Sequence, residues 1–178
     1  MEKPDQYLIP AARHGENEII KELLKRGANL NFQDEKGYTP LMIACYNNRA
    51  ATAELLISYG ADLNLADYGG NTPLMAAAFK GYRDIAELLI SHQADLNLQH
   101  GNGGTALMFA AMFGRNDLLK LLIQQGADTS LRDARGLSVL DLARLQGNEE
   151  AVRYLSETQP TGRMQPVRNS AHRDTEDT

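Results

Sequence analysis

Apolar residues in this chain gather in pairs of short clusters that are separated by polar turns. Within residues 34–66, one cluster lies in 40–46 and a second in 51–59, with the polar pair Asn47-Asn48 between them. Each cluster spans about two helical turns and is bounded by turn-forming residues, which is the pattern of a short helix with a buried face. The pattern therefore predicts two consecutive helices with a break at Asn47-Asn48.

The ends of the two predicted helices carry their own signals. Thr39 is a favoured N-cap, and Pro40 suits the first helical position, where a missing N–H removes no hydrogen bond. Gly60 is expected to end the second helix in a left-handed backbone conformation. Residues 34–37 indicate a tight turn in which Gly37 supplies a permissive backbone.

The whole unit recurs at a fixed interval. Thr39-Pro40-Leu41 returns as Thr72-Pro73-Leu74, a step of 33 residues from position 39 to position 72. The frame continues as Thr105-Ala106-Leu107 and Ser138-Val139-Leu140, and the turn glycines share it: Gly37, Gly70, Gly103 and Gly136. A strict period of this size is typical of a solenoid, so we predict an all-α solenoid of about five stacked helix-turn-helix units with hairpin-like loops.

The repeated unit resembles the ankyrin repeat. The resemblance rests on Asp, Gly, Thr-Pro-Leu, paired Ala, Gly, Leu-Leu and Gly-Ala in one register, covers residues 5–158, and is fullest in 34–66 and 67–99. It implies that the first helices line a concave face from which the loops project as fingers. It also implies a protein-binding module without catalytic activity. The plain, loop-poor repeats are more typical of bacterial than of animal members.

Domain boundaries follow from the repeat register. We assign residues 1–158 to an ankyrin repeat domain, made of an N-terminal cap 1–33, three repeats 34–66, 67–99 and 100–132, and a C-terminal cap 133–158. Residues 159–178 are polar and contain two prolines. Such a segment cannot bury enough apolar surface to offset its ordering entropy, so we expect a disordered tail.

Several positions depart from the family pattern. Gln93 stands where a helix-ending glycine belongs, and His100 replaces a loop aspartate. Arg144 occupies a column that is otherwise small, as suits a cap that faces water. Methionine replaces a frequent histidine after the Thr-Pro-Leu run, at Met42, Met75 and Met108.

Charge and composition exclude several classes of function. The net charge of −5 argues against a nucleic-acid-binding face, which is normally basic. The charged N-terminus does not have the pattern of a secretory signal, and the chain contains no run of 18 apolar residues that could span a membrane. We therefore expect a cytoplasmic protein. The lone Cys45 is interpreted as a buried thiol. No histidine has metal-ligand spacing and no catalytic pair is evident, so we expect no metal, no cofactor and no enzymatic activity.

One column of the repeat has the chemistry of a binding surface. At the end of each predicted first helix lie large apolar residues: Tyr46, Phe79, Met112 and Leu145. Lys80 and Phe113 follow directly, and finger positions hold Tyr38, Tyr68, Asn71 and Arg135. Aromatic and Met side chains at the centre of a concave surface are typical of interface hot spots. The alternative is that these side chains only pack between adjacent units.

The function that these residues favour is the binding of another protein in the concave groove, by a chain that is a monomer when free. An alternative is an inhibitor, such as an immunity or antitoxin protein, that covers the active site of an enzyme or toxin. Small size, a rigid domain and an acidic charge that would oppose a basic toxin motivate this alternative. On the predicted outer helices, Glu54 and Glu87 share a column and are interpreted as a solvated stripe.

Overall fold

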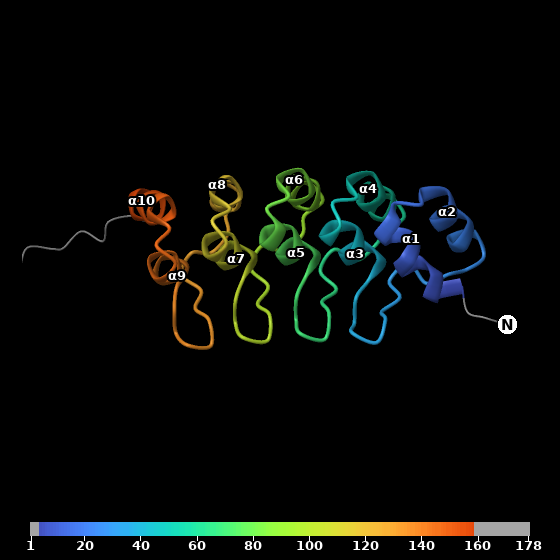
Figure 1. Cartoon of the computed structure of the whole chain (residues 1–178), viewed down its shortest axis with the longest axis horizontal. Helices are drawn as coiled ribbons and strands as arrows, with labels where there is room; N and C mark the ends of the chain where they lie inside the picture. The colour runs from blue at the N-terminus through green and yellow to red at the C-terminus, as the bar shows by residue number, and fades with distance from the viewer. Residues whose placement is uncertain (1–3, 159–178) are drawn as a thin grey trace, which may run out of the picture.

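The computed structural model describes residues 4–158 and consists of antiparallel helix pairs stacked in a row (Figure 1). A 3₁₀ turn, η1 (Pro4–Tyr7), precedes the pairs α1 (Leu8–His14) and α2 (Asn17–Lys25), α3 (Pro40–Tyr46) and α4 (Ala50–Ser58), α5 (Pro73–Lys80) and α6 (Arg83–Ser91), α7 (Ala106–Met112) and α8 (Asn116–Gln124), and α9 (Val139–Leu145) and α10 (Glu149–Thr158). The predicted all-α solenoid is confirmed. Its unit boundaries stay a prediction, and the predicted tail at 159–178 lies outside the described residues.

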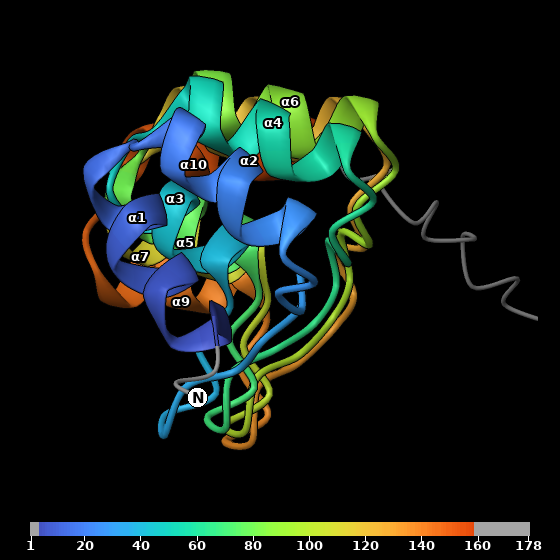
Figure 2. The ribbon, with the colours of Figure 1, turned by 90° about the vertical axis from the view of Figure 1, so that its right-hand side faces the viewer.

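The helices form two layers. The first helices, α1, α3, α5, α7 and α9, pack against one another in an inner layer, and the second helices lie behind them in an outer layer (Figure 2). Between pairs the chain runs out into long hairpin-like fingers on one side of the stack, and these fingers superimpose from unit to unit along its axis (Figure 2). None of the helices in residues 4–158 is long and apolar enough to cross a membrane.

Threonine caps start the three inner helices α3, α5 and α7. Thr39 has an extended backbone, and its hydroxyl accepts the N–H of Met42 at 3.1 Å. The same contact recurs at 3.3 Å in the next two units, Thr72 with Met75 and Thr105 with Met108. The predicted N-cap at Thr39 is therefore confirmed. Although Ala106 replaces proline, α7 begins at the same position of the repeat, because the cap hydrogen bond is retained.

Small and branched apolar residues alternate in the core between the layers. The outer helices contribute Leu56, Leu89 and Leu122, each 0% exposed. The inner helices contribute alanines of one column that are also 0% exposed: Ala44, Ala77, Ala110 and Ala143. Alanine at this column lets neighbouring inner helices approach closely. Cys45 is buried, as predicted, and burial raises the pKa of its thiol to about 12.

Asparagine side chains join neighbouring units at the loops that follow the outer helices. The side-chain carbonyl of Asn31 accepts the N–H of Asp62 at 2.9 Å. The contact recurs at 2.8 Å one and two units later, Asn64 with Asp95 and Asn97 with Asp128. Together with the core, these bonds make the stack a continuous scaffold for the inner face.

Gln93 adopts the left-handed conformation that its column predicts. Its φ is +66°, against +89° at Gly60 and +92° at Gly126. Its N–H donates to the carbonyl of Ile90 at 2.9 Å, so α6 ends with the same turn as the other outer helices. A residue with a side chain is strained by about 1 kcal/mol or more in this conformation.

Replacing Gln93 by glycine should therefore raise the free energy of unfolding by up to about 1 kcal/mol, less the added freedom of glycine in the unfolded chain. Urea denaturation measures the change. The converse substitution, Gly126→Gln, should lower stability by a similar amount, because no atom lies within 4 Å of a Cβ at Gly126 and only backbone strain is added. A Gln93→Gly variant that unfolds at lower urea than the wild type would contradict the assignment.

Candidate functional site

A groove runs along the stack between the inner helices and the fingers. It consists of three hollows of about 690, 470 and 550 Å³ in order from the N-terminal end. Arg13 and Tyr38 line both the first and the central hollow, and Phe109 lines both the central and the last. Because these residues are shared, the hollows form one continuous surface from α1 to α9.

The central hollow is the most aromatic part of this groove. Its helix side is formed by Tyr46 and Phe79, and its floor includes the buried Met42 and Met75. Tyr38 and the polar pair of Asp67 and Asn71 line it from the finger side, and Arg13 lines it from α1. Methionine is polarisable and adaptable, so a floor of this kind accommodates apolar groups of varied shape.

Aromatic rings connect the units along the groove. The ring of Tyr46 stacks at 6.5 Å on that of Phe79, which meets Phe113 edge-on at 4.6 Å. Phe113 in turn stacks at 6.2 Å on Phe109, whose ring lies 5.2 Å from the imidazole of His100. The residues do pack across units, yet Tyr46 is still 43% and Phe113 41% exposed. The packing alternative is therefore correct for part of each ring, while a large apolar area faces the groove.

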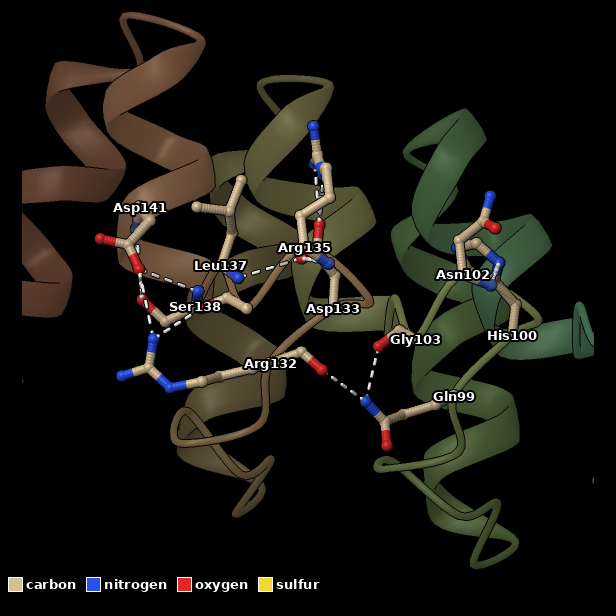
Figure 3. Close-up of polar contacts among 11 residues, drawn as sticks. Gln99, His100, Asn102, Gly103, Arg132, Asp133, Arg135, Leu137, Ser138 and Asp141 are labelled. Atoms are coloured by element: carbon tan, nitrogen blue, oxygen red, sulfur yellow. Dashed lines mark hydrogen bonds and ion pairs between the residues drawn. The ribbon is translucent and has the colours of Figure 1, made fainter.

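Each finger is closed by a side chain that accepts backbone N–H groups. In the second finger, the Asp67 carboxylate accepts the N–H groups of Gly69 at 2.9 Å and Asn71 at 2.8 Å. In the third, His100 takes over this role, because its Nδ1 accepts the N–H of Asn102 at 3.1 Å (Figure 3). The histidine that replaces the loop aspartate thus preserves the turn, with one backbone hydrogen bond where Asp67 accepts two.

Backbone contacts tie each finger to the next. The N–H of Tyr68 donates to the carbonyl of Lys36 at 3.1 Å, and the N–H of Gly101 donates to that of Gly69 at 2.9 Å. The Gln99 amide donates to the carbonyls of its own finger, at Gly103, and of the following one, at Arg132 (Figure 3). The finger wall of the groove is therefore held in place by hydrogen bonds from both sides.

The predicted site residues divide among several locations. Tyr38, Tyr46, Asn71 and Phe79 meet in the central hollow, and Met112 and Arg135 line the last one. Lys80 and Phe113 border these hollows, since the ammonium of Lys80 lies 4.5 Å from the ring centre of Tyr46 and Phe113 contacts Phe79. Tyr68 and Leu145 line none of the three hollows and are 72% and 65% exposed. Their role in binding stays a prediction.

The groove residues that the sequence analysis missed include Arg13 and Phe109. Arg13 lies 33 positions before Tyr46 and so shares its column, which could have identified it. Phe109 shares its column with Ile43, Ala76 and Leu142, which have the character of core residues. Its ring is only half-buried because it reaches past the helix into the groove, and the column gives no sign of this.

Two carboxylates of the finger wall, those of Asp67 and Asp133, are engaged in structural contacts. Asp133 is bonded by the N–H of Leu137 at 3.0 Å and paired with Arg135 at 2.8 Å, and these contacts, with the Leu137 bond foremost, hold its pKa below the usual range (Figure 3). No group of three His, Cys, Asp or Glu side chains within residues 4–158 could hold a metal ion. The groove therefore offers apolar and aromatic contact area with a polar border.

Comparison with known proteins agrees with this architecture. A sequence profile described as ankyrin repeats (3 copies) matches residues 8–100 and 93–163. A stretch of 50 residues is 46% identical to the ankyrin repeat domain-containing protein SAT10 of Stachybotrys chartarum and covers 28% of this chain and 3% of that protein. A stretch of 45 residues is 42% identical to the tyrosine-protein kinase HTK16 of Hydra vulgaris and covers 25% of this chain and 6% of that protein. The chain thus matches only a small part of these relatives, whereas the profile covers most of its length, and the chain belongs to the ankyrin repeat family.

Proposed function

We propose that this chain binds another protein through the groove between its inner helices and its fingers. The proposal rests on where large apolar side chains remain exposed. Of the seven exposed large apolar residues within 4–158, Tyr46 lines the central hollow and Phe113 borders it, whereas Tyr68 and Leu145 lie on a finger and at the end of an inner helix, outside the three hollows. Clustered aromatic and aliphatic groups in a concave, polar-bordered surface are the usual anchors of a protein interface.

The rigidity of the groove supports the same role. The inner helices α3, α5, α7 and α9 have side-chain caps, the fingers are cross-linked by hydrogen bonds, and the rings are held against each other at 4.6–6.5 Å. A preorganised surface loses little conformational freedom on association, so more of the contact energy appears as affinity. Ankyrin repeats are generally protein–protein interaction modules without catalytic activity, which agrees with a groove that offers contact area.

Within this proposal, Tyr46, Phe79, Met112 and Phe113 are the apolar anchors. Tyr38, Asn71 and Arg135 supply hydrogen bonds from the fingers. The free chain is proposed to be a cytoplasmic monomer, and sedimentation of the purified chain tests the monomeric state. Whether the complex inhibits an enzyme is decided by the turnover of the captured partner with and without this chain.

Two exposed tyrosines of one repeat provide a matched test. Tyr46 is 43% exposed in the groove, and Tyr59 is 50% exposed at the end of the outer helix α4. With the intact chain as bait and mass spectrometry as readout, Tyr46→Ala should lose the captured partner and Tyr59→Ala should retain it. Equal capture by the two variants, both folded by circular dichroism, would place the binding surface outside the groove.

A further inference from the structure

The turns that join the two helices of each unit carry a charge opposite to that of the whole chain. We call these segments the turn row; they are residues 13–16, 46–49, 79–82, 112–115 and 145–148. The turn row holds four cations, Arg13, Arg49, Lys80 and Arg115, and one carboxylate, Glu16, although the whole chain has a net charge of −5. The remaining surface is correspondingly more acidic, so the charge of this protein is strongly segregated.

Contacts place the four cations beside the aromatic side of the groove. Lys80 lies 4.5 Å from the ring centre of Tyr46, and Arg13 lines the central hollow. The Nε–H of Arg49 donates to the carbonyl of Arg13 at 3.0 Å, and that of Arg115 donates to the carbonyl of Phe79 at 3.3 Å. Each of the first four turn-row segments therefore contributes one cation to this side of the groove, and the last segment contributes none.

These cations have no carboxylate partner among the described residues. All four lack an ion pair within 4.0 Å. Four cations on or at the ends of outer helices, by contrast, are paired at 2.6–2.9 Å: Lys21 with Glu18, Arg26 with Glu22, Arg83 with Glu87 and Lys120 with Glu150.

Helix ends explain only part of this arrangement. Cations near helix C-termini offset the partial negative charge there, and the carbonyl contacts of Arg49 and Arg115 are of this kind. Each contact uses one of the five N–H donors of a guanidinium and leaves its positive charge without a counter-ion. The groups are thus positioned by the fold and remain available to an anion.

The finger wall of the groove carries more negative than positive charges, which is the opposite of the turn row. Its charged residues include Asp34, Glu35, Asp67 and Asp133, against Lys36 and Arg135. An acidic partner would therefore be attracted to the turn row and repelled from the fingers, which determines the side on which its carboxylates lie.

We propose that the partner presents an extended acidic segment along the turn row, with a carboxylate at about every third residue and apolar side chains between. The proposal rests on the groove function proposed above. Packed helices lie about 8–10 Å apart. An extended chain of the polyproline II form has three residues per turn and advances about 3.1 Å per residue, so residues three apart lie on one face and span one unit. Carboxylates at this interval would each meet one cation, and the intervening apolar residues would reach the aromatic anchors.

The probe is a fluorescein-labelled peptide of four Glu-Val-Ser triplets, titrated with the full chain and followed by fluorescence anisotropy. Versions with Gln or Lys in place of Glu, and one with all four Glu at one end, are compared at low salt. The Glu triplet peptide should bind about tenfold more tightly than the Gln peptide, more tightly still than the Lys peptide, and more tightly than the end-clustered isomer. Its advantage should disappear at about 0.5 M salt.

A charge-matched pair of variants locates the effect. Removing two turn-row cations, Arg13→Gln with Lys80→Gln, should abolish most of the preference for Glu. Removing two exposed cations of the outer helices, Lys25→Gln with Arg153→Gln, changes the net charge equally and should leave the preference intact. Neither pair removes a backbone hydrogen bond, so melting temperatures should match that of the wild type.

Four outcomes would overturn the proposal: no binding of any peptide, equal binding of the Glu and Gln peptides, equal loss in both variant pairs, or tighter binding of a single-stranded oligothymidylate than of the Glu peptide. The last would indicate a nucleic-acid surface. None of them affects the capture experiment with Tyr46→Ala and Tyr59→Ala, which tests the groove function independently of partner charge.

Discussion

Replacing Phe79 by alanine is expected to weaken partner binding by about 30-fold, or about 2 kcal/mol. Phe79 lies at the centre of the aromatic series, stacked at 6.5 Å on Tyr46 and edge-on at 4.6 Å to Phe113, and it lines the central hollow. Truncation removes its own contact area and also the support that holds two neighbouring rings in place. Isothermal titration calorimetry with the captured partner measures the loss.

Two controls separate binding from folding. Phe79→Leu retains apolar volume and should lose less affinity than Phe79→Ala. Glu54→Gln, on the exposed outer face of α4, should cost under about 0.5 kcal/mol and mainly alter the salt dependence. The melting temperature of Phe79→Ala should stay near that of the wild type, because the ring is only half-buried. Unchanged affinity, or general unfolding, would show that the aromatic series is packing alone.

Gly70→Ala should be the most destabilising of the substitutions considered, at about 3 kcal/mol. Gly70 has φ of +86°, and a Cβ there would lie 2.9 Å from both the nitrogen of Gly101 and the Cα of His100. Both atoms belong to the backbone of the next finger, so neither can move aside as a side-chain end would. The energetic costs of the backbone strain and of the steric overlap add, and the third finger would be displaced from the second.

Gly136→Ala is the matched control from the same column of the repeat. Its φ is +79°, but no atom lies within 4 Å of the added Cβ, so only backbone strain of about 1 kcal/mol is expected. Thermal unfolding measures both, and a difference of about 2 kcal/mol corresponds to about 4–8 °C in a chain of this size. Equal melting temperatures for the two variants would mean that neighbouring fingers are not held at this distance.

Only some of the residues that line the groove could be predicted from the sequence. Column positions singled out Tyr46, Phe79 and Met112, which line the hollows, because residues 33 apart occupy equivalent places in a stack. The same logic would have found Arg13. Phe109 could not be found in this way, since its column is otherwise core-like, and whether a ring fills the core or faces the groove depends on the volume left by neighbouring units.

By itself, the sequence determined the helices, their caps, their order and the left-handed residues, because these depend on local backbone preferences repeated in one register. It predicted φ correctly even at Gln93. Only the tertiary structure determined which atoms surround equivalent residues in different repeats. Gly70 and Gly136 share a column and a backbone conformation, yet one touches the next finger and the other touches nothing. The charge of the turn row was likewise hidden within an acidic chain, because cations about 33 residues apart become neighbours only when the units stack.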